Sequence, residues 1–175
     1  MKLNKIKRIC KDEKTVFIME QKDSAGGIYQ WIGDGKALFT AEGLPAVCPQ
    51  ELLTVFDVPE REWDKWTTKI IEVRDEVVFA DSFPGEERAR ELDARIAFQG
   101  FELQPILGEN GEVFYIQTKY LEPLSGKENL EIFIRRAGDA VYLAVKVGLY
   151  LYGIVTPAKA PEELRRMFQI LGEGL

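Results

Sequence analysis

The sequence predicts a single α+β domain in which a mainly antiparallel sheet is combined with short helices. Its length of 175 residues suits one domain with a substantial core. Many short segments read as strands, and glycine-containing turns separate them, as in antiparallel sheets. Near the N-terminus the apolar residues recur instead with helical spacing. Together these observations indicate short helices packed on a sheet of short strands.

The first expected element is a short amphipathic helix over residues 3–11. Apolar residues recur there every three to four positions, which is the period of one helical face. The apolar face consists of Leu3, Ile6, Ile9 and Cys10. The opposite face and its margins carry Asn4, Lys5, Lys7, Arg8 and Lys11. The helix is therefore expected to present a strongly positive surface to solvent.

Three strands are expected next, over residues 15–20, 28–32 and 36–41. The last two flank Gly33-Asp34-Gly35-Lys36, which at first sight looks like a phosphate-binding loop. A P-loop, however, needs a glycine where this chain has Gln30 and a Ser or Thr where it has Ala37. No helix is expected after the lysine, so no helix N-terminus is available to receive a phosphate. We therefore interpret the loop as a tight hairpin turn with a solvent-exposed Lys36.

The middle of the chain, residues 46–111, is interpreted as an insertion of less regular structure. Within it we expect strands over residues 52–58 and 77–83, a helix over residues 59–68 and a charged helix over residues 85–98. Pro59 occupies a favourable position in the first turn of its helix, and Trp63 and Trp66 share one helical face. The mixed charges of the later helix predict a solvated surface rather than a binding strip.

The last third of the chain has clearer signals. Two strands over residues 101–107 and 112–117 flank Asn110-Gly111, which is a strong hairpin signal. A short helix over residues 118–124 should follow. The remaining expected elements are strands over residues 130–136, 141–147 and 149–155 and an amphipathic helix within residues 158–175.

The chain contains no histidine, which removes the usual general base near neutral pH and the commonest metal ligand. Ser-His and Cys-His nucleophile pairs are excluded as well, and two cysteines cannot complete a zinc site. We expect Cys10 and Cys48 to be buried free thiols; a disulfide between them is the alternative. A carboxylate-based cation site or hydrolase stays open in principle, but no motif supports it. We therefore expect a non-enzymatic protein without a cofactor or metal.

The formal net charge of −6 argues against indiscriminate binding to nucleic acid but permits a local basic patch. No apolar run approaches the ~18 residues that a membrane helix needs, so we expect no membrane association. The basic N-terminal stretch has no apolar segment behind it and does not read as a signal peptide. These features favour a cytoplasmic protein.

Residues 1–45 and 112–157 share an order of elements, namely helix, two strands, a tight turn at glycine and a further strand. The matched positions include Tyr29 with Tyr142 and Gly35 with Gly148, at a constant spacing of 113 residues, and nearly also Lys5 with Lys119. This alignment predicts two related halves of one fold. Coincidence is the alternative, because any two amphipathic hairpins share the same alternation.

With its leading strand, the second half has the order strand, helix and three strands. Its helix begins with the "KYL" pattern of Lys119-Tyr120-Leu121, and its last strand ends in Val155-Thr156-Pro157. In these features and in the opening MKLNKIKRIC the chain resembles the sliding DNA clamps, the processivity factors of replication. The resemblance implies a domain of two β-α-β-β-β units with helices toward duplex DNA and the sheet outside. The chain is also similar to small prophage proteins of gut Firmicutes.

This resemblance implies a binding protein that contacts duplex DNA or a host or phage replication protein. The residues expected at DNA phosphates are Lys5, Lys7, Arg8, Lys11 and Lys119. Lysine and arginine on one face neutralise backbone charge without reading sequence. The alternative is that these cations only keep a short helix solvated. Clamp rings contain six such domains, so a ring of this chain requires a larger homo-oligomer.

A second hypothesis is a phage-encoded protein–protein interaction module that does not contact DNA. Aromatic side chains are common anchors of such interfaces. The candidates are Trp31, Trp63, Trp66, Tyr142, Tyr150 and Tyr152. Core packing is the alternative, because tyrosines at a period of two on a strand more often cover a sheet face than a partner.

Overall fold

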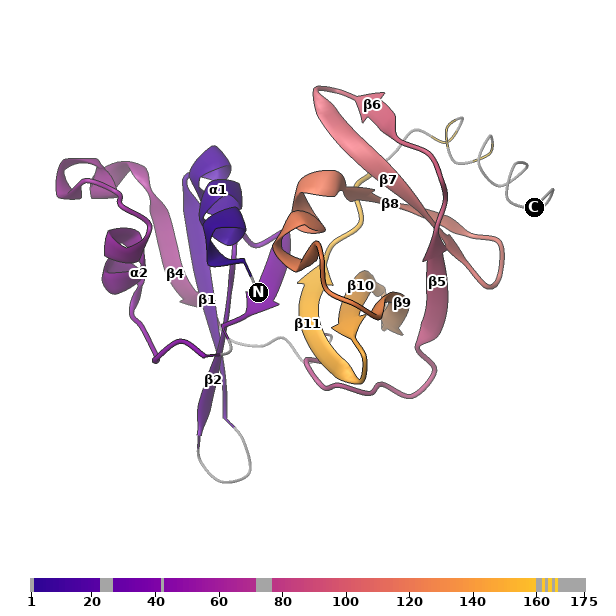
Figure 1. Ribbon diagram of the computed structural model, residues 1–175, viewed down its shortest axis with the longest axis horizontal. Coiled ribbons are helices and arrows are strands. Elements are labelled where there is room, and N and C mark those ends of the chain that lie inside the picture. Colours follow the sequence, from indigo (N-terminus) through magenta and orange to yellow (C-terminus); the bar gives the residue numbers. More distant parts are fainter. Residues whose placement is uncertain are drawn as a thin grey trace.

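The computed structural model describes residues 2–22, 27–41, 43–71 and 77–159, together with residues 162, 164 and 166. The described strands form one 11-stranded sheet in the order β4-β1-β2-β3-β11-β10-β9-β5-β7-β6, and β8 pairs with β7. The pair of β1 and β4 is parallel, and the other pairs of described strands are antiparallel. Figure 1 shows the β4 end on the left and the β6 end at the upper right. The predicted α+β class with a mainly antiparallel sheet is confirmed.

Within residues 2–159, as far as the structure describes them, the helical segments are α1 (Leu3–Glu13), α2 (Pro49–Val55) and the short 3₁₀ helices η1 (Glu60–Lys65), η2 (Thr118–Tyr120) and η3 (Glu122–Leu124). The first six strands are β1 (Thr15–Lys22), β2 (Ile28–Gly33), β3 (Ala37–Thr40), β4 (Thr67–Ile71), β5 (Glu87–Glu91) and β6 (Ile96–Phe98). The others are β7 (Phe101–Gly108), β8 (Val113–Gln117), β9 (Leu130–Ala137), β10 (Ala140–Val147) and β11 (Tyr150–Val155).

Helix α1 forms for the reason that its periodicity predicts. Its buried residues are Ile6, Ile9 and Cys10, which face the sheet. The helix ends at Lys14, whose left-handed backbone (φ 47°) directs its N–H to the carbonyl oxygens of Cys10 and Lys11. This arrangement satisfies carbonyls that a helix end would otherwise leave unpaired.

The alternation of the strands divides the core into two layers. On one face of the sheet, side chains such as Val16, Ile18 and Phe39 pack with α1, α2, η2 and η3; we call this the helical face. The neighbouring residues along the strands point the other way. On that opposite face, Met19, Leu38 and other residues pack against Phe79. Phe79 belongs to residues 77–86, an irregular segment that we call the strap.

Three predictions for the middle of the chain were wrong in the type of element. Residues 52–58 were expected to be a strand, but Leu52 and Leu53 are buried residues of helix α2. The helix begins with Pro49 in its first turn, and the Glu51 carboxylate accepts a hydrogen bond of 2.7 Å from the Cys48 backbone N–H. This capping box precedes residues 52–58, so the apolar run over those residues alone predicts the wrong type of element.

The charged helix expected over residues 85–98 is instead the two strands β5 and β6. Strand β5 lies between β9 and β7 and is hydrogen-bonded to both. Ladders on two edges outweigh the helix propensity of a sequence rich in Glu, Arg and Ala, because propensity is weaker than tertiary pairing. Residues 77–83 were expected to be a strand, but they form no strand hydrogen bonds to a neighbouring strand. Side-chain contacts hold this part of the strap on the sheet.

The other expected elements differ in smaller ways. The hairpins around residues 33–36 and 109–111 and the last three strands are confirmed. The helix expected over residues 59–68 is the 3₁₀ helix η1 followed by β4, and the one over residues 118–124 consists of η2 and η3. Cys48 is a free thiol as expected but is exposed, not buried. The predicted helix of residues 158–175 lies mostly outside the described residues.

Candidate nucleic-acid interface

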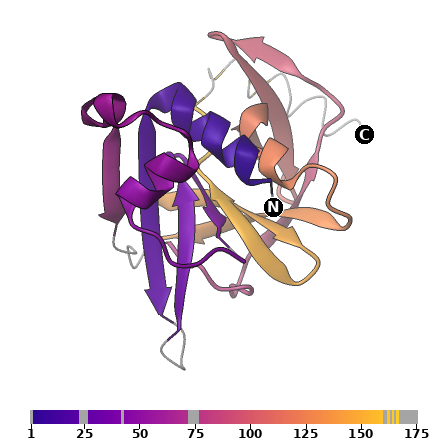
Figure 2. The same cartoon turned by 60° about the vertical axis from the view of Figure 1, so that its left-hand side comes forward.

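Helix α1 and the 3₁₀ helices η2 and η3 lie side by side on the helical face, although more than 100 residues separate them in the sequence. The backbone N–H of Lys2 donates a hydrogen bond of 3.1 Å to the carbonyl oxygen of Pro123. Figures 1 and 2 both show α1 (indigo) next to these short helices (orange). The two segments predicted to carry phosphate-binding cations therefore share one surface.

A first group of charges joins α1 to η3. The Glu122 carboxylate receives the Lys5 ammonium at 2.9 Å and the Arg8 guanidinium at 3.2 Å. Lys5 and Arg8 were both predicted at phosphates, whereas Glu122 was not singled out. Two cations thus share one carboxylate, which leaves the group with a net positive charge.

A second group joins the end of α1 to η2 and to the hairpin of β2 and β3. The Glu13 carboxylate receives Lys36 at 3.1 Å and Lys119 at 3.3 Å. These contacts lower the pKa of Glu13, chiefly through the hydrogen bond from Lys36. The ammonium of Lys119 also lies 5.2 Å from the centre of the Tyr120 ring. This group, like the first, holds two cations and one carboxylate.

The remaining predicted cations lie further along α1. Lys7 forms an ion pair with Asp57, which follows α2, and its hydrogen bond is the main reason why the pKa of Asp57 is lowered. Lys11 forms no ion pair with a described residue and is exposed. The five predicted residues are therefore gathered around one helix, but four of them are engaged with carboxylates.

The hairpin turn has a structural role that the sequence did not reveal. The buried Asp34 accepts hydrogen bonds from the backbone N–H groups of Lys36 (2.9 Å) and Ala37 (3.0 Å). Its second carboxylate oxygen accepts a hydrogen bond of 2.8 Å from the hydroxyl of Tyr120 on η2. Burial and the charge of Asp34 raise the pKa of Tyr120, so its hydroxyl stays a neutral donor. The Asp-Gly turn signal predicted the hairpin but could not indicate this distant partner.

Gly35 cannot be replaced by a larger residue without strain. Its backbone lies in the left-handed region (φ 86°), and an added Cβ would come within 2.4 Å of the Phe17 ring. Lys36 is exposed as predicted and also pairs with Glu13. The loop thus orients Asp34 and Lys36 toward the helical face, and it turns the chain between two strands.

The part of the helical face formed by α1, η2 and η3 differs in charge from the chain as a whole. Residues 2–14 and 118–128, which contain α1, η2 and η3, carry eight Lys or Arg side chains and four Asp or Glu side chains. The complete chain instead has 23 basic and 29 acidic residues. A net positive charge is therefore concentrated on α1, η2 and η3, whereas α2 carries Glu51 and no basic side chain.

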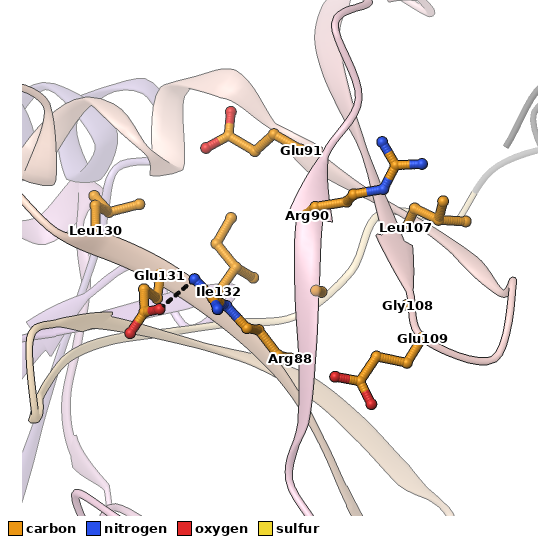
Figure 3. A pocket seen from close by; sticks show the side chains of 10 residues that line it. Arg88, Arg90, Glu91, Leu107, Gly108, Glu109, Leu130, Glu131 and Ile132 are labelled. Carbon is orange, nitrogen blue, oxygen red and sulfur yellow. Dashed lines mark ion pairs between the residues drawn. The ribbon is translucent and has the colours of Figure 1, made fainter. Parts of the chain in front are cut away.

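One cavity among the described residues has a volume of about 510 Å³. It lies beside β5, where Arg88 and Glu131 form an ion pair of 2.6 Å (Figure 3). The guanidinium groups of Arg88 and Arg90 diverge from the strand in this view, so they do not converge on a common ligand. The described residues include no cluster of three or more acidic or cysteine side chains that could hold a metal ion.

Cys10 and most aromatic candidates belong to the core. Burial raises the pKa of the Cys10 thiol, which keeps it protonated and unreactive. Five aromatic candidates pack in or against the core, namely Trp31, Trp63, Trp66, Tyr142 and Tyr152. Tyr152 is partly buried, with the Lys127 ammonium 4.7 Å from its ring centre. Tyr150 is exposed.

In the part of the chain that the structure describes, no helix has the length and apolar character needed to cross a membrane. No protein-family model matches the chain, and neither the curated proteins nor the solved structures include a significant match.

Proposed function

We propose that this chain is a non-enzymatic binding protein with a clamp-like fold, and that its helical face contacts the phosphate backbone of duplex DNA. The observation that carries the proposal is the side-by-side placement of α1 with η2 and η3, which brings Lys5, Arg8 and Lys119 onto one positive surface. Cations on one face attract phosphates without reading base sequence, and their contribution depends strongly on salt.

The strand order supports a duplicated, clamp-like arrangement. The central run β1-β2-β3-β11-β10-β9 has the same order from either end, with α1 before β1 and η2-η3 before β9. The pair Gly33 and Leu38 in the first hairpin corresponds to Lys146 and Leu151 in the second at the spacing of 113 residues. A bulge at Val145/Lys146 shifts the rest of the second hairpin by one residue.

Binding of a short fluorescent DNA duplex, measured by anisotropy at low and at physiological salt, tests this function. The wild-type protein should bind with an affinity that falls steeply as salt rises. The double variant Lys5→Gln/Arg8→Gln should bind several-fold more weakly and show a smaller salt slope. The matched control Arg88→Gln/Arg90→Gln removes two cations from β5 and should have little effect. Absence of binding by the wild-type protein at low salt would eliminate the proposal.

One observation favours protein–protein interaction as a second candidate. Exposed Tyr29 and Tyr150 line a cavity of about 420 Å³ together with Trp31 and Phe79, on the face opposite the helices. Tyrosines at an open surface can anchor a protein partner. A pull-down from a bacterial lysate should then recover a protein with the wild-type chain but not with Tyr29→Ser/Tyr150→Ser. Equal recovery by both proteins would remove this candidate.

A further inference from the structure

The cations on the helical face form ion pairs with two glutamates, and these ion pairs bear on the affinity of this face for DNA. Resting on the proposed function, we propose that Glu13 and Glu122 act as internal competitors of DNA phosphate and keep the affinity of the helical face low. We call these two residues the competitor carboxylates. Each occupies two cations that a phosphate would otherwise contact.

The competitor carboxylates are placed to hold cations from separate segments. Glu122 extends from η3 to Lys5 and Arg8 of α1, and Glu13 extends from α1 to Lys36 and Lys119. A carboxylate and a phosphate oxygen accept the same charge-assisted hydrogen bonds from lysine and arginine. DNA that approaches this face must therefore exchange one acceptor for another.

The exposure of these groups makes the exchange accessible. About a third of the side chain of each competitor carboxylate is exposed. The side chains of Lys5, Arg8 and Lys36 are exposed by a third or more, and that of Lys119 by 15%. Ion pairs at such positions are weak and are screened by salt. Phosphate groups of DNA can displace the carboxylates without unfolding the helical segments, because Tyr120 and Asp34 hold η2 independently.

Removing one competitor should strengthen binding. The isosteric variant Glu122→Gln abolishes the negative charge and frees Lys5 and Arg8 for phosphates. From the typical strength of exposed pairs we expect about three- to tenfold tighter binding to a short fluorescent duplex. Glu13→Gln should act in the same direction, and it provides a second variant if either protein folds poorly. Circular dichroism and thermal unfolding would establish that the variants are folded.

Glu128→Gln is the matched control, because it changes the net charge equally on the same segment. Glu128 is exposed and forms no ion pair with a described residue, so its variant should bind within about twofold of the wild type. Equal gains in Glu122→Gln and Glu128→Gln would overturn the proposal, since net charge alone would then explain both. Unchanged or weaker binding by both folded competitor variants would also overturn it.

These outcomes differ from those that would defeat the proposed function. If the wild-type protein binds duplex DNA and Lys5→Gln/Arg8→Gln weakens binding, the function stands whatever the competitor variants do. If the wild-type protein does not bind at low salt, DNA binding itself is excluded and the competitor role with it.

Discussion

The group of two cations around Glu122 on the helical face has the same composition as a group around Glu86 on the opposite face, and these two groups differ mainly in burial. On the helical face, the side chains of Lys5, Glu122 and Arg8 are 33%, 31% and 59% exposed. Under the strap, those of Arg135, Glu86 and Lys146 are 0%, 14% and 7% exposed. The composition is the same, but the surroundings give the two groups different uses.

The buried group holds the strap on the sheet. The guanidinium of Arg135 contacts the Glu86 carboxylate at 2.8 Å and donates a hydrogen bond of 2.9 Å to the carbonyl oxygen of Val78. The Lys146 ammonium pairs with the same carboxylate and lies 4.3 Å from the Phe133 ring centre. With little water present, each charge depends on its partner.

The strap is further fixed by hydrogen bonds that replace a strand ladder. The hydroxyl of Tyr142 accepts the backbone N–H of Val78 at 2.9 Å, and the carboxylate of Asp81 accepts the backbone N–H of Leu151 at 2.8 Å. The ion pairs around Glu86 therefore stabilise the fold, because the strap covers them. The ion pairs around Glu122 lie at an open surface and remain accessible to a ligand.

The largest expected effect comes from removing the buried carboxylate charge. In Glu86→Gln, the cations of Arg135 and Lys146 lose their counter-charge while they remain buried. We expect the free energy of unfolding to fall by about 3–5 kcal/mol, measured by urea denaturation. Glu131→Gln, which breaks the more exposed pair with Arg88, should cost less than about 1 kcal/mol. Equal losses would mean that burial does not separate the two kinds of pair.

A smaller but clear loss is expected from the anchor of the helical face. Asp34→Ala removes the acceptor of two turn N–H groups and of the Tyr120 hydroxyl, which should cost about 2–3 kcal/mol in urea unfolding. Tyr120→Phe removes one of these three hydrogen bonds and should cost about 1 kcal/mol. If both variants were as stable as the wild type, the anchor of η2 would have to lie elsewhere.

The exposed group should contribute little to stability. Glu122→Gln leaves Lys5 and Arg8 in contact with water, so the free energy of unfolding should change by about 0.5 kcal/mol. Urea denaturation alongside Glu86→Gln measures the contrast directly. A loss comparable with that of Glu86→Gln would contradict the distinction between the two faces.

The smallest expected effect is a pH dependence that arises from Glu13. Its pKa is lower in the folded protein than its ordinary value of 4.5, because Lys36 and Lys119 favour the charged form. The resulting stability is therefore present above pH 4.5 and is lost as the pH falls below that value. Glu13→Gln should lose about 0.3 kcal/mol less than the wild type between pH 7 and pH 3. An identical acid profile of the two proteins would argue against this contribution.

Elements with strong local signals were predicted correctly. Helix α1 follows from the spacing of Ile6, Ile9 and Cys10, and the hairpins follow from their glycine-containing turns. Strand β5 was missed because its state depends on two neighbours, β7 and β9, that lie elsewhere in the sequence. The signal for helix α2 is also local, but it lies in Pro49 and Glu51. These residues precede the apolar run over residues 52–58, which by itself predicts a strand.

The candidate site likewise combines features that the local sequence predicts with features that depend on distant segments. The sequence determined that α1 is amphipathic and that cations occupy its outer face, because helical periodicity is a property of a dozen consecutive residues. Which carboxylates those cations contact depends on the tertiary structure, since Glu122 lies 117 residues from Lys5. The tertiary structure also brings Asp34 into hydrogen-bond contact with Tyr120 and buries Glu86 between two cations. Charge and helical periodicity are properties of the local sequence. The ion pairs and the burial of side chains depend on which distant segments the sheet brings together.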